Sequence, residues 1–238
     1  MLRTMLGEPR RKDAGALLAA NQAIYAYLQM LDTIPTAERN PQERRYNIWG
    51  RSFLRAVDEL EQSQYAAIRF GNGVNRVYID EMSEDERDDY HRHLYFYKNA
   101  IVRMFAILDK MGHFMNERFR LRTEDVKKRF SYFTVLRNMH DNRLYAEVEE
   151  QLFELKNKYE EPVKRLRTAR NMEIHTIDAD LLDDLINAAE SLHSQQRIRT
   201  ENIKEQLSDL GFGCEMAFTA VHILFSYLHK LAHTGSGK

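Results

Sequence analysis

Turn-forming residues and cysteine are scarce in this sequence. Its 238 residues include ten Gly, four Pro and a single Cys, Cys214. An all-β or loop-rich fold would need many more turn residues, so the shortage favours helices. One cysteine excludes an intrachain disulfide and any zinc site built on several thiolates.

Long hydrophobic runs and an excess of charge are also lacking. No run of about 18 apolar residues occurs, so we expect no membrane span. Residues 1–7 lack the apolar core of a signal peptide, and a cytoplasmic location is therefore expected. The formal net charge is −1, so no global basic field recruits nucleic acid. Any RNA contact must rest on a local basic patch.

The residues that are present form helical patterns. Hydrophobic residues make up 43% and charged residues 30% of the chain, a globular composition. Apolar side chains recur at spacings of three and four, which is typical of amphipathic helices. With capping signals, these spacings predict helices over residues 9–31, 41–70, 84–119, 123–139, 141–175, 178–198 and 200–233.

Several interruptions of this helical pattern are expected. The segment 74–79, in which Val74, Val77 and Ile79 are β-branched, predicts a short strand or an extended loop. Pro162 should kink or restart the helix in which it lies. Gly211 and Gly213 are expected to break the last helical region. The prediction is an all-α fold, an elongated antiparallel helical bundle. It forms one domain over 1–233, and 234–238 are a flexible tail or an expression remnant.

One arginine conflicts with the apolar pattern around it. At 100° per residue, Leu152, Tyr159, Val163 and Arg170 fall within about 20° of one direction. Arg170 therefore continues an apolar face, although a guanidinium cannot be deprotonated. Its burial requires a carboxylate, a phosphate or a partner subunit. Such conflicts concentrate at functional sites.

A histidine follows this arginine after four residues. His175 lies about 140° around the helix from Arg170, so the two meet only under certain conditions. Either the helix ends or distorts there, or a second subunit places its own copy opposite. The residues 176–178 are typical of a helix break. Asn171 and His175 are four apart and can interact directly.

The stretch 170–175 resembles the HEPN ribonuclease motif, which is an Arg followed after four to six residues by a His. Asn171 matches the polar residue that commonly follows the Arg. The resemblance covers about 90–180, and residues 95–121 are similar to one bacterial branch of the superfamily. The matching segments there are Tyr97-Lys98-Asn99, Asp109-Lys110-Met111-Gly112, Asn116 and Phe119-Arg120-Leu121.

This resemblance implies a homodimer with two motifs facing one cleft and, in active members, RNA cleavage without a metal or other cofactor. His175 would transfer protons, because its pKa lies near neutrality. Arg170 would hold the scissile phosphate and stabilise its developing charge. Asn171 would orient His175 or bind a phosphate oxygen. A local positive field would come from Lys164, Arg165 and Arg167.

The function expected first is therefore an endoribonuclease of defence or toxin–antitoxin type, with RNA and an antitoxin or other protein as partners. Two alternatives remain open. The chain could be a non-catalytic protein- or nucleotide-binding member of the same fold, or a structural helical adaptor. In the non-catalytic cases Arg170 would pair with an acid such as Glu173, and His175 would be a cation at a helix end.

Two other groups of residues invite functional interpretations that the sequence does not favour. His91 and His93 are two apart, so on a helix they point about 200° apart and cannot chelate one metal ion. The segment 137–140 repeats the Arg-Asn-Met start of the motif, but its His follows too early. We interpret it as a cationic helix C-terminus.

Overall fold

A computed structural model describes residues 2–35, 37–175 and 199–235 of the chain, with side chains at 2–35, 37–172 and 199–232. In these ranges the chain is helical, as predicted, and an isolated bridge is its one β-type pairing. The elements are α1 (Leu2–Met5), α2 (Gly15–Asp32), α3 (Pro41–Gly71), η1 (Ile79–Glu81), α4 (Glu84–Phe119), α5 (Thr123–Val126), α6 (Tyr132–Asp141), α7 (Ala146–Lys158), α8 (Glu160–His175) and α10 (Ile203–Gly235).

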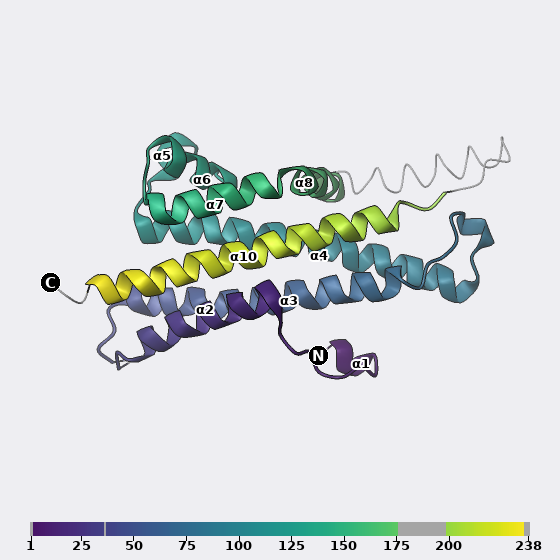
Figure 1. The fold of residues 1–238 in the computed structure, drawn as a ribbon, viewed down its shortest axis with the longest axis horizontal. Coiled ribbons are helices and arrows are strands. Elements are labelled where there is room, and N and C mark those ends of the chain that lie inside the picture. The colour runs from purple at the N-terminus through teal and green to yellow at the C-terminus, as the bar shows by residue number, and fades with distance from the viewer. Residues whose placement is uncertain (1, 36, 176–198, 236–238) are drawn as a thin grey trace.

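Three long helices set the elongated shape of the bundle (Figure 1). The antiparallel pair α3 and α4 packs along most of its length, and α10 lies against both. In Figure 1, α10 runs between α2 on one side and the α7–α8 pair on the other. Helix α10 therefore packs between α2 and the α7–α8 pair and joins them.

The starts of the long helices follow their capping residues. Asn40 and Glu43 form a reciprocal capping box at α3, with Pro41 in the first turn. Ser83 caps α4 by accepting from the Glu86 amide at 3.2 Å. The Glu86 carboxylate does not complete a second box. It accepts instead from the backbone amides of the preceding loop, and so fixes that loop against α4.

The segment 74–79 is an extended loop, one of the two predicted alternatives. A single antiparallel bridge joins Tyr78 to Arg199, and Thr200 donates its amide to the Val77 carbonyl at 2.8 Å. The short 3₁₀ helix η1 follows directly. This loop therefore fixes the chain just before α10.

Three predicted helix boundaries before residue 146 were wrong. The first long helix begins at Gly15 and not at Pro9, because Arg11 is held in a polar network instead of a helical turn. The predicted helix over 123–139 is divided into α5 and α6. Asp141 is the last residue of α6, and α7 begins only after Tyr145, which has a left-handed backbone.

The helix interruptions predicted at Pro162 and at Gly211 and Gly213 had different outcomes. A restart near Pro162 is confirmed: α7 ends at Lys158, α8 begins at Glu160, and Pro162 lies in the first turn of α8, where its missing amide proton is not needed. The break at Gly211 and Gly213 was wrong, because α10 is continuous through both. The helix predicted over 178–198 lies outside the described residues.

Gly213 has a packing role in α10. A Cβ placed there would lie 2.5 Å from both the Met104 sulfur and Leu166 Cδ1. Glycine thus lets α10 approach α4 and α8 closely. A similar contact occurs at Gly112, where a Cβ would lie 2.7 Å from the backbone Cα of Tyr132. Both glycines are needed for helix packing and not for turns.

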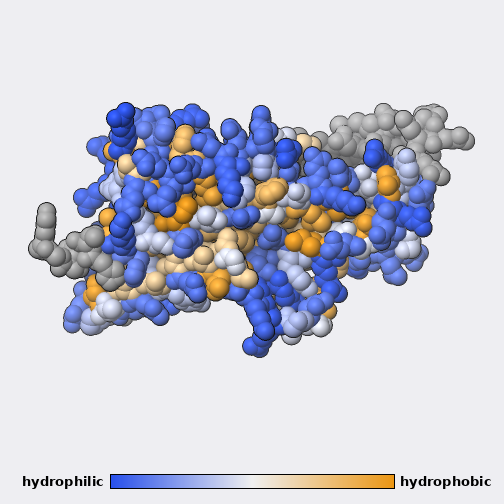
Figure 2. Space-filling model, viewed as in Figure 1, coloured by the Kyte–Doolittle hydropathy of each residue, from blue (hydrophilic) through white to orange (hydrophobic). Residues whose placement is uncertain are grey.

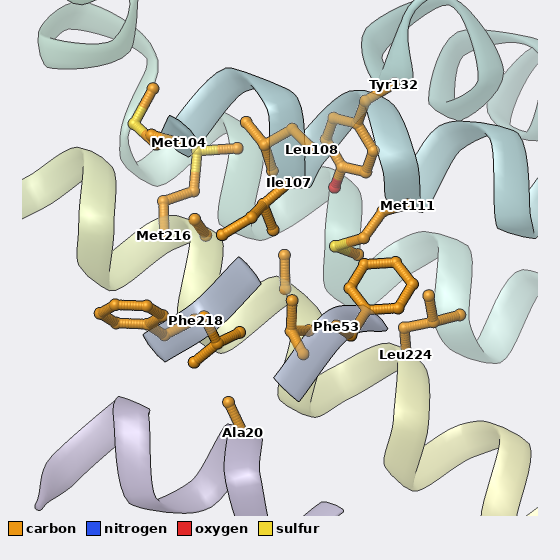
Figure 3. Packing of buried hydrophobic residues seen from close by; sticks show 14 of the residues in the cluster. Ala20, Phe53, Met104, Ile107, Leu108, Met111, Tyr132, Met216, Phe218 and Leu224 are labelled. Atoms are coloured by element: carbon orange, nitrogen blue, oxygen red, sulfur yellow. The ribbon is translucent and has the colours of Figure 1, made fainter. Parts of the chain in front are cut away.

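The core lies between α2, α3, α4, α6, α7, α8 and α10, and Figure 3 shows part of it. The Phe53 and Phe225 rings pack edge to face with centroids 5.2 Å apart, and Phe114 lies within 6 Å of both. All three side chains are fully buried. Aromatic pairs of this kind add roughly 0.5–1.5 kcal/mol beyond area burial, so this cluster is a main stabilising centre.

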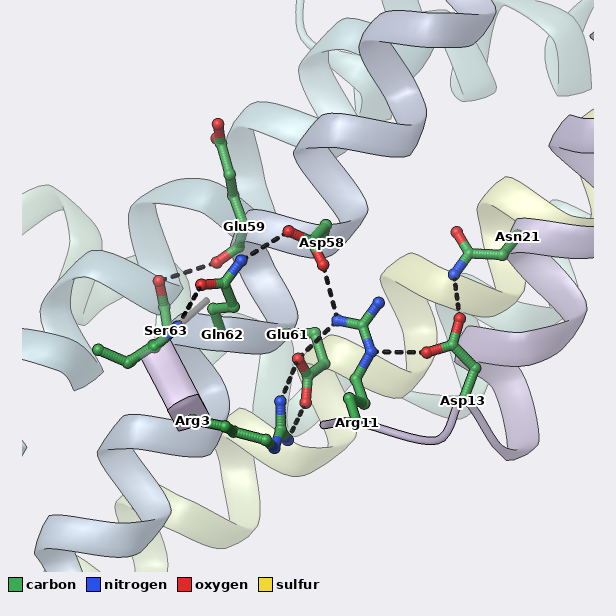
Figure 4. Close-up of polar contacts among 10 residues, drawn as sticks. Arg3, Arg11, Asp13, Asn21, Asp58, Glu59, Glu61, Gln62 and Ser63 are labelled. Atoms are coloured by element: carbon green, nitrogen blue, oxygen red, sulfur yellow. Dashed lines mark hydrogen bonds and ion pairs between the residues drawn. The ribbon is translucent and has the colours of Figure 1, made fainter. Parts of the chain in front are cut away.

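A polar network attaches the N-terminal segment to α3 (Figure 4). The buried carboxylate of Glu61 accepts hydrogen bonds from the guanidinium groups of Arg3 and Arg11. Arg11 also pairs with Asp13 at 2.6 Å and with Asp58 at 2.9 Å. The network therefore holds residues 3–13 in place without a long helix.

The length and composition of α10 would allow it to cross a membrane over Ile203–Ala232, contrary to the expectation from apolar runs. More than half of its most apolar window is buried inside the bundle. Helices α2, α3, α4, α7 and α8 all contact it. A helix that lies between other helices is apolar for the same reason as a membrane span, so its burial in the core accounts for its composition.

Candidate functional site

The apolar stripe predicted along α7 and α8 is buried and leads to Arg170. Six of its residues are buried against the bundle, namely Val148, Leu152, Leu155, Tyr159, Val163 and Leu166. The pattern persists across the break between α7 and α8 because Tyr159 itself remains in the core. Arg170 lies one turn beyond Leu166 and is half-buried. The predicted conflict between residue type and position is therefore present.

The guanidinium of Arg170 lies over an aromatic ring. Its Cζ atom is 4.5 Å from the centroid of Phe105 on α4. Its Nη2 and Nε atoms donate to Oδ1 of Asn171, at 2.9 and 3.3 Å. Among carboxylates whose side chains are described, none forms an ion pair with Arg170. Among the described side chains, its charge is therefore faced by a ring and a neutral amide.

A pocket of about 240 Å³ adjoins Arg170. It lies between α4, α8 and the first turn of α10 with the residues just before it. Its lining residues are Leu94, Tyr97, Lys98, Ile101, Ala169, Arg170, Met172, Glu201 and Gln206. The pocket brings Tyr97 and Lys98 together with Arg170, although they are some 70 residues apart in the sequence. Tyr97 and Lys98, from one of the four segments of the 95–121 resemblance, therefore lie beside the Arg170 end of the motif.

Burial has changed the titration of one pocket residue. The pKa of Tyr97 is raised by burial, and further by the negative charges of Asp209, Glu201 and Glu205. Its hydroxyl therefore stays protonated at neutral pH. Tyr97 can act there as a neutral hydrogen-bonding group but not as a base.

Arg167 lies one helical turn before Arg170 and is held in the same way. Its Cζ atom is 4.3 Å from the ring centroid of Phe133 on α6. Burial lowers the pKa of Arg167, and the nearby charge of Arg170 lowers it further. The two arginines thus repel each other across a partly desolvated surface. An anion that bound between them would relieve that repulsion.

The other two predicted basic residues differ from each other. Arg165 donates to both carboxylate oxygens of Asp209 on α10, at 2.6 and 2.7 Å. Asp209 is 6% exposed, so this pair ties α8 to α10. Lys164 is exposed, and its carbonyl accepts from the Thr168 hydroxyl. Of the three predicted phosphate-contacting residues, Arg165 is therefore engaged in a structural ion pair.

His175 is the last residue of α8, and its side chain lies outside the described residues. The same holds for Glu173, the acid considered as a partner of Arg170. The predicted contact between Asn171 and His175 and the pairing of Arg170 with Glu173 both stay predictions. Asn171 accepts from Arg170, so its amide group remains available as a donor.

Sequence reasoning missed the aromatic partners of the two arginines. Phe105 and Phe133 contact α8 from α4 and α6, and no local pattern links them to residues 167 and 170. The sequence did offer one signal. Arg167 and Arg170 are three residues apart, so they share a helix face beside the apolar stripe.

The two groups whose functional interpretation the sequence did not favour, the His91/His93 pair and the segment 137–140, each contain a residue with a structural role. His93 is fully buried and stacks on Tyr97, and its Nδ1 atom lies 2.8 Å from the Ala67 carbonyl oxygen. Asn138 donates to the Leu121 carbonyl and to the Thr123 hydroxyl, which joins α6 to the turn after α4. Their contacts with neighbouring helices account for both.

A family model named HEPN_Cthe2314-like HEPN matches residues 49–229, which is more than half of the chain. The chain belongs to this HEPN family. The predicted superfamily membership is thus confirmed, and the motif residues 170–175 lie inside the matched range. Comparisons with curated proteins and with solved structures gave no match.

In this HEPN protein, the match spans most of α3 and all of α4 to α8, together with most of α10. It therefore includes the helices that carry the 240 Å³ pocket and both ring-stacked arginines. Helix α2 lies before the matched range and covers the other side of α10.

Proposed function

We propose that this HEPN protein is a metal-independent endoribonuclease whose cleavage site is centred on Arg170 and His175. The observation that supports it best is the half-buried guanidinium of Arg170. It lies over Phe105 at the rim of a pocket, with a neutral amide as its hydrogen-bond acceptor. Among the described side chains no carboxylate pairs with it, and a guanidinium beside a pocket can hold a phosphate.

The chemistry would proceed by attack of a ribose 2′-OH on the adjacent phosphorus. His175 would accept the 2′-OH proton, the 5′-oxygen would leave with a proton, and a 2′,3′-cyclic phosphate would form. Arg170 would hold two non-bridging oxygens, where charge grows in the transition state. Asn171 would release its hydrogen bond from Arg170 and accept one from His175 instead, or it would donate a hydrogen bond to a phosphate oxygen.

Two histidines are needed if one removes a proton while the other supplies one. A symmetric homodimer would bring two copies of His175 to one groove. The surface offers support for such an association. Hydrophobic residues gather over the middle of the face along α10, between hydrophilic margins (Figure 2). Met172 and Phe212 are exposed apolar residues on α8 and α10, at 56% and 47%.

RNA would reach this site by a local field and not by the net charge of the chain. Lys164 and Arg167 lie on α8 within two turns of Arg170. They could contact flanking phosphates, whereas Arg165 is held by Asp209. Such contacts predict binding that weakens steeply as salt rises. We place this activity in the cytoplasm, in RNA-based defence or toxin–antitoxin regulation, where an inhibitory protein partner would control it.

The test is cleavage of a varied panel of single-stranded RNAs by purified protein in EDTA. His175→Ala should reduce the rate ~100- to 10,000-fold, the usual contribution of general acid–base catalysis. Arg170→Ala should do the same, and Arg170→Lys should recover only part of the rate, because lysine lacks the two-pronged donor geometry. Sedimentation should give a dimer for each active form.

Matched controls come from residues of the same types elsewhere. His91→Ala and Arg137→Ala change an exposed histidine on α4 and an exposed arginine on α6, and both should cleave normally. Cleavage that survives undiminished in His175→Ala would refute the assignment. If the wild-type dimer binds RNA or a partner protein and cuts nothing, the non-catalytic alternative is correct. A monomer that binds neither would indicate the structural adaptor.

A further inference from the structure

A second and larger pocket lies at the opposite end of the bundle from Arg170. Its volume is about 1000 Å³, at the upper end of the range for small-molecule sites. It forms where the turn between α2 and α3 meets the C-terminal ends of α4 and α10. Its walls include Tyr27, Tyr46, Arg118, Arg120, Tyr145 and His229. From Lys98 to Arg118 is 20 residues along α4, or about 30 Å, so this site is separate from the ribonuclease site.

Arg118 is the central charge of this pocket. Its Nε atom is buried and has no hydrogen-bond partner among the described residues. Its Cζ atom lies 5.3 Å from the ring centroid of Tyr46. No carboxylate with a described side chain lies within ion-pair distance of it. A half-buried guanidinium without a counter-charge is costly, and an anion in the pocket would offset that cost.

The neighbours of Arg118 do not supply the missing charge. Burial raises the pKa of the Tyr27 hydroxyl to about 12, although the charge of Arg118 and a hydrogen bond with Arg118 oppose this. The phenol therefore stays neutral at physiological pH and gives Arg118 a neutral partner. The one carboxylate in the lining belongs to Glu43. It accepts from the Asn40 amide at 2.9 Å as part of the α3 capping box. The pocket is therefore positive in its interior.

Two residues at the pocket have an unfavourable backbone conformation. Arg120 and Tyr145 have φ values of 53° and 54°, in the left-handed region that normally suits glycine. The Tyr145 hydroxyl donates to the Phe119 carbonyl at 3.1 Å, and its ring stacks on Phe119 at 4.4 Å. These contacts hold the ring in the pocket wall despite the strain.

We propose that this pocket binds a small organic anion. Its phosphate or carboxylate group pairs with the fork of Arg118, and Arg120 contributes at the entrance. Its flat apolar body lies against the rings of Tyr46 and Tyr145. Arginine binds planar oxyanions through two parallel hydrogen bonds, and aromatic walls favour a flat ligand over a simple ion.

Titration calorimetry of the full chain tests the proposal with four probes: phenyl phosphate, benzoate, inorganic phosphate and acetate. The ring-bearing probes should bind with saturable heat, and tighter than the ring-free anions. A preference for phenyl phosphate or for benzoate identifies the head group. Arg118→Gln should weaken binding about tenfold or more, since hydrogen bonds to charged groups contribute at this level.

Arg120→Gln provides a second variant, because this side chain is exposed and its replacement leaves the interior packing unchanged. It should weaken binding less than Arg118→Gln. Arg137→Gln, an exposed arginine on α6, should bind as the wild type does. Circular dichroism should show unchanged helix content in all three variants. Absence of saturable binding by either ring-bearing probe, or equal affinity of Arg118→Gln and the wild type, would overturn the proposal.

Discussion

Replacing Gly112 by alanine tests whether the approach of α4 to α6 sets the stability of the bundle. A Cβ at this position would lie 2.7 Å from the Tyr132 Cα and 2.9 Å from its backbone nitrogen. Backbone atoms cannot move aside as the end of a side chain can. The start of α6 must therefore shift, and Tyr132, which is fully buried, must shift with it.

The magnitude combines two opposing contributions. Overpacking a core usually costs about 1–3 kcal/mol, and contact with backbone puts this case toward the upper value. Alanine gains about 1 kcal/mol over glycine in helix propensity. We expect Gly112→Ala to lower the free energy of unfolding by about 1–2 kcal/mol. Gly211→Ala is the matched control, because it lies inside α10 and its Cβ would meet nothing within 4 Å. It should stabilise the fold by up to about 1 kcal/mol.

Urea denaturation followed by circular dichroism measures both variants, at one fixed protein concentration because a dimer would make stability depend on it. The midpoints should move in opposite directions, and the slopes should stay equal. If Gly112→Ala proves as stable as Gly211→Ala, the close approach seen at Tyr132 does not constrain the fold, and the packing argument fails.

Two further predictions concern charged pairs. Burial alone raises the pKa of Glu61, but hydrogen bonds from its two arginines outweigh this and lower it below 4.5. The carboxylate therefore stabilises the fold above that pH. Urea titrations at neutral pH should show Glu61→Gln to be less stable than the wild type by about 1–3 kcal/mol. This difference in unfolding free energy should shrink as the pH falls below 4.5, because the carboxylate becomes protonated. A difference that grows at low pH would contradict the argument. Arg165→Ala leaves Asp209 buried and unpaired, so thermal melts should show a lower melting temperature, whereas Lys164→Ala should melt as the wild type does. Equal melting of these two variants would argue against a structural role for the ion pair.

Helix type and the buried faces could be predicted from local chemistry. Pro41 and the Ser83 cap placed the starts of α3 and α4 correctly, because both signals act within the first turn of their own helix. The stripe from Val148 to Leu166 is buried as expected, since its spacing repeats the helical period. Arg170 was identified as anomalous for the same reason.

Local chemistry did not predict the role of the glycines in α10 or the boundaries of the short helices α5 and α6. Gly211 and Gly213 were expected to break α10, yet Gly213 is inside a helix because Met104 and Leu166 leave no room for a side chain. The division of 123–139 into α5 and α6 depends on tertiary packing, with Tyr132 donating its amide to Asp109 on α4. Such contacts join residues that no local pattern relates.

Composition and periodicity alone establish that the chain is helical, which helix faces are buried, and that Arg170 interrupts an apolar stripe. These properties depend on periodicity and residue type within a few turns of helix. The surroundings of each charge, in contrast, depend on how the helices pack. This packing sets Arg170 over Phe105, engages Arg165 with Asp209 and leaves Arg118 without a counter-charge in a large pocket. The cost of a charge depends on its desolvation and partners, and those come from helices distant in sequence.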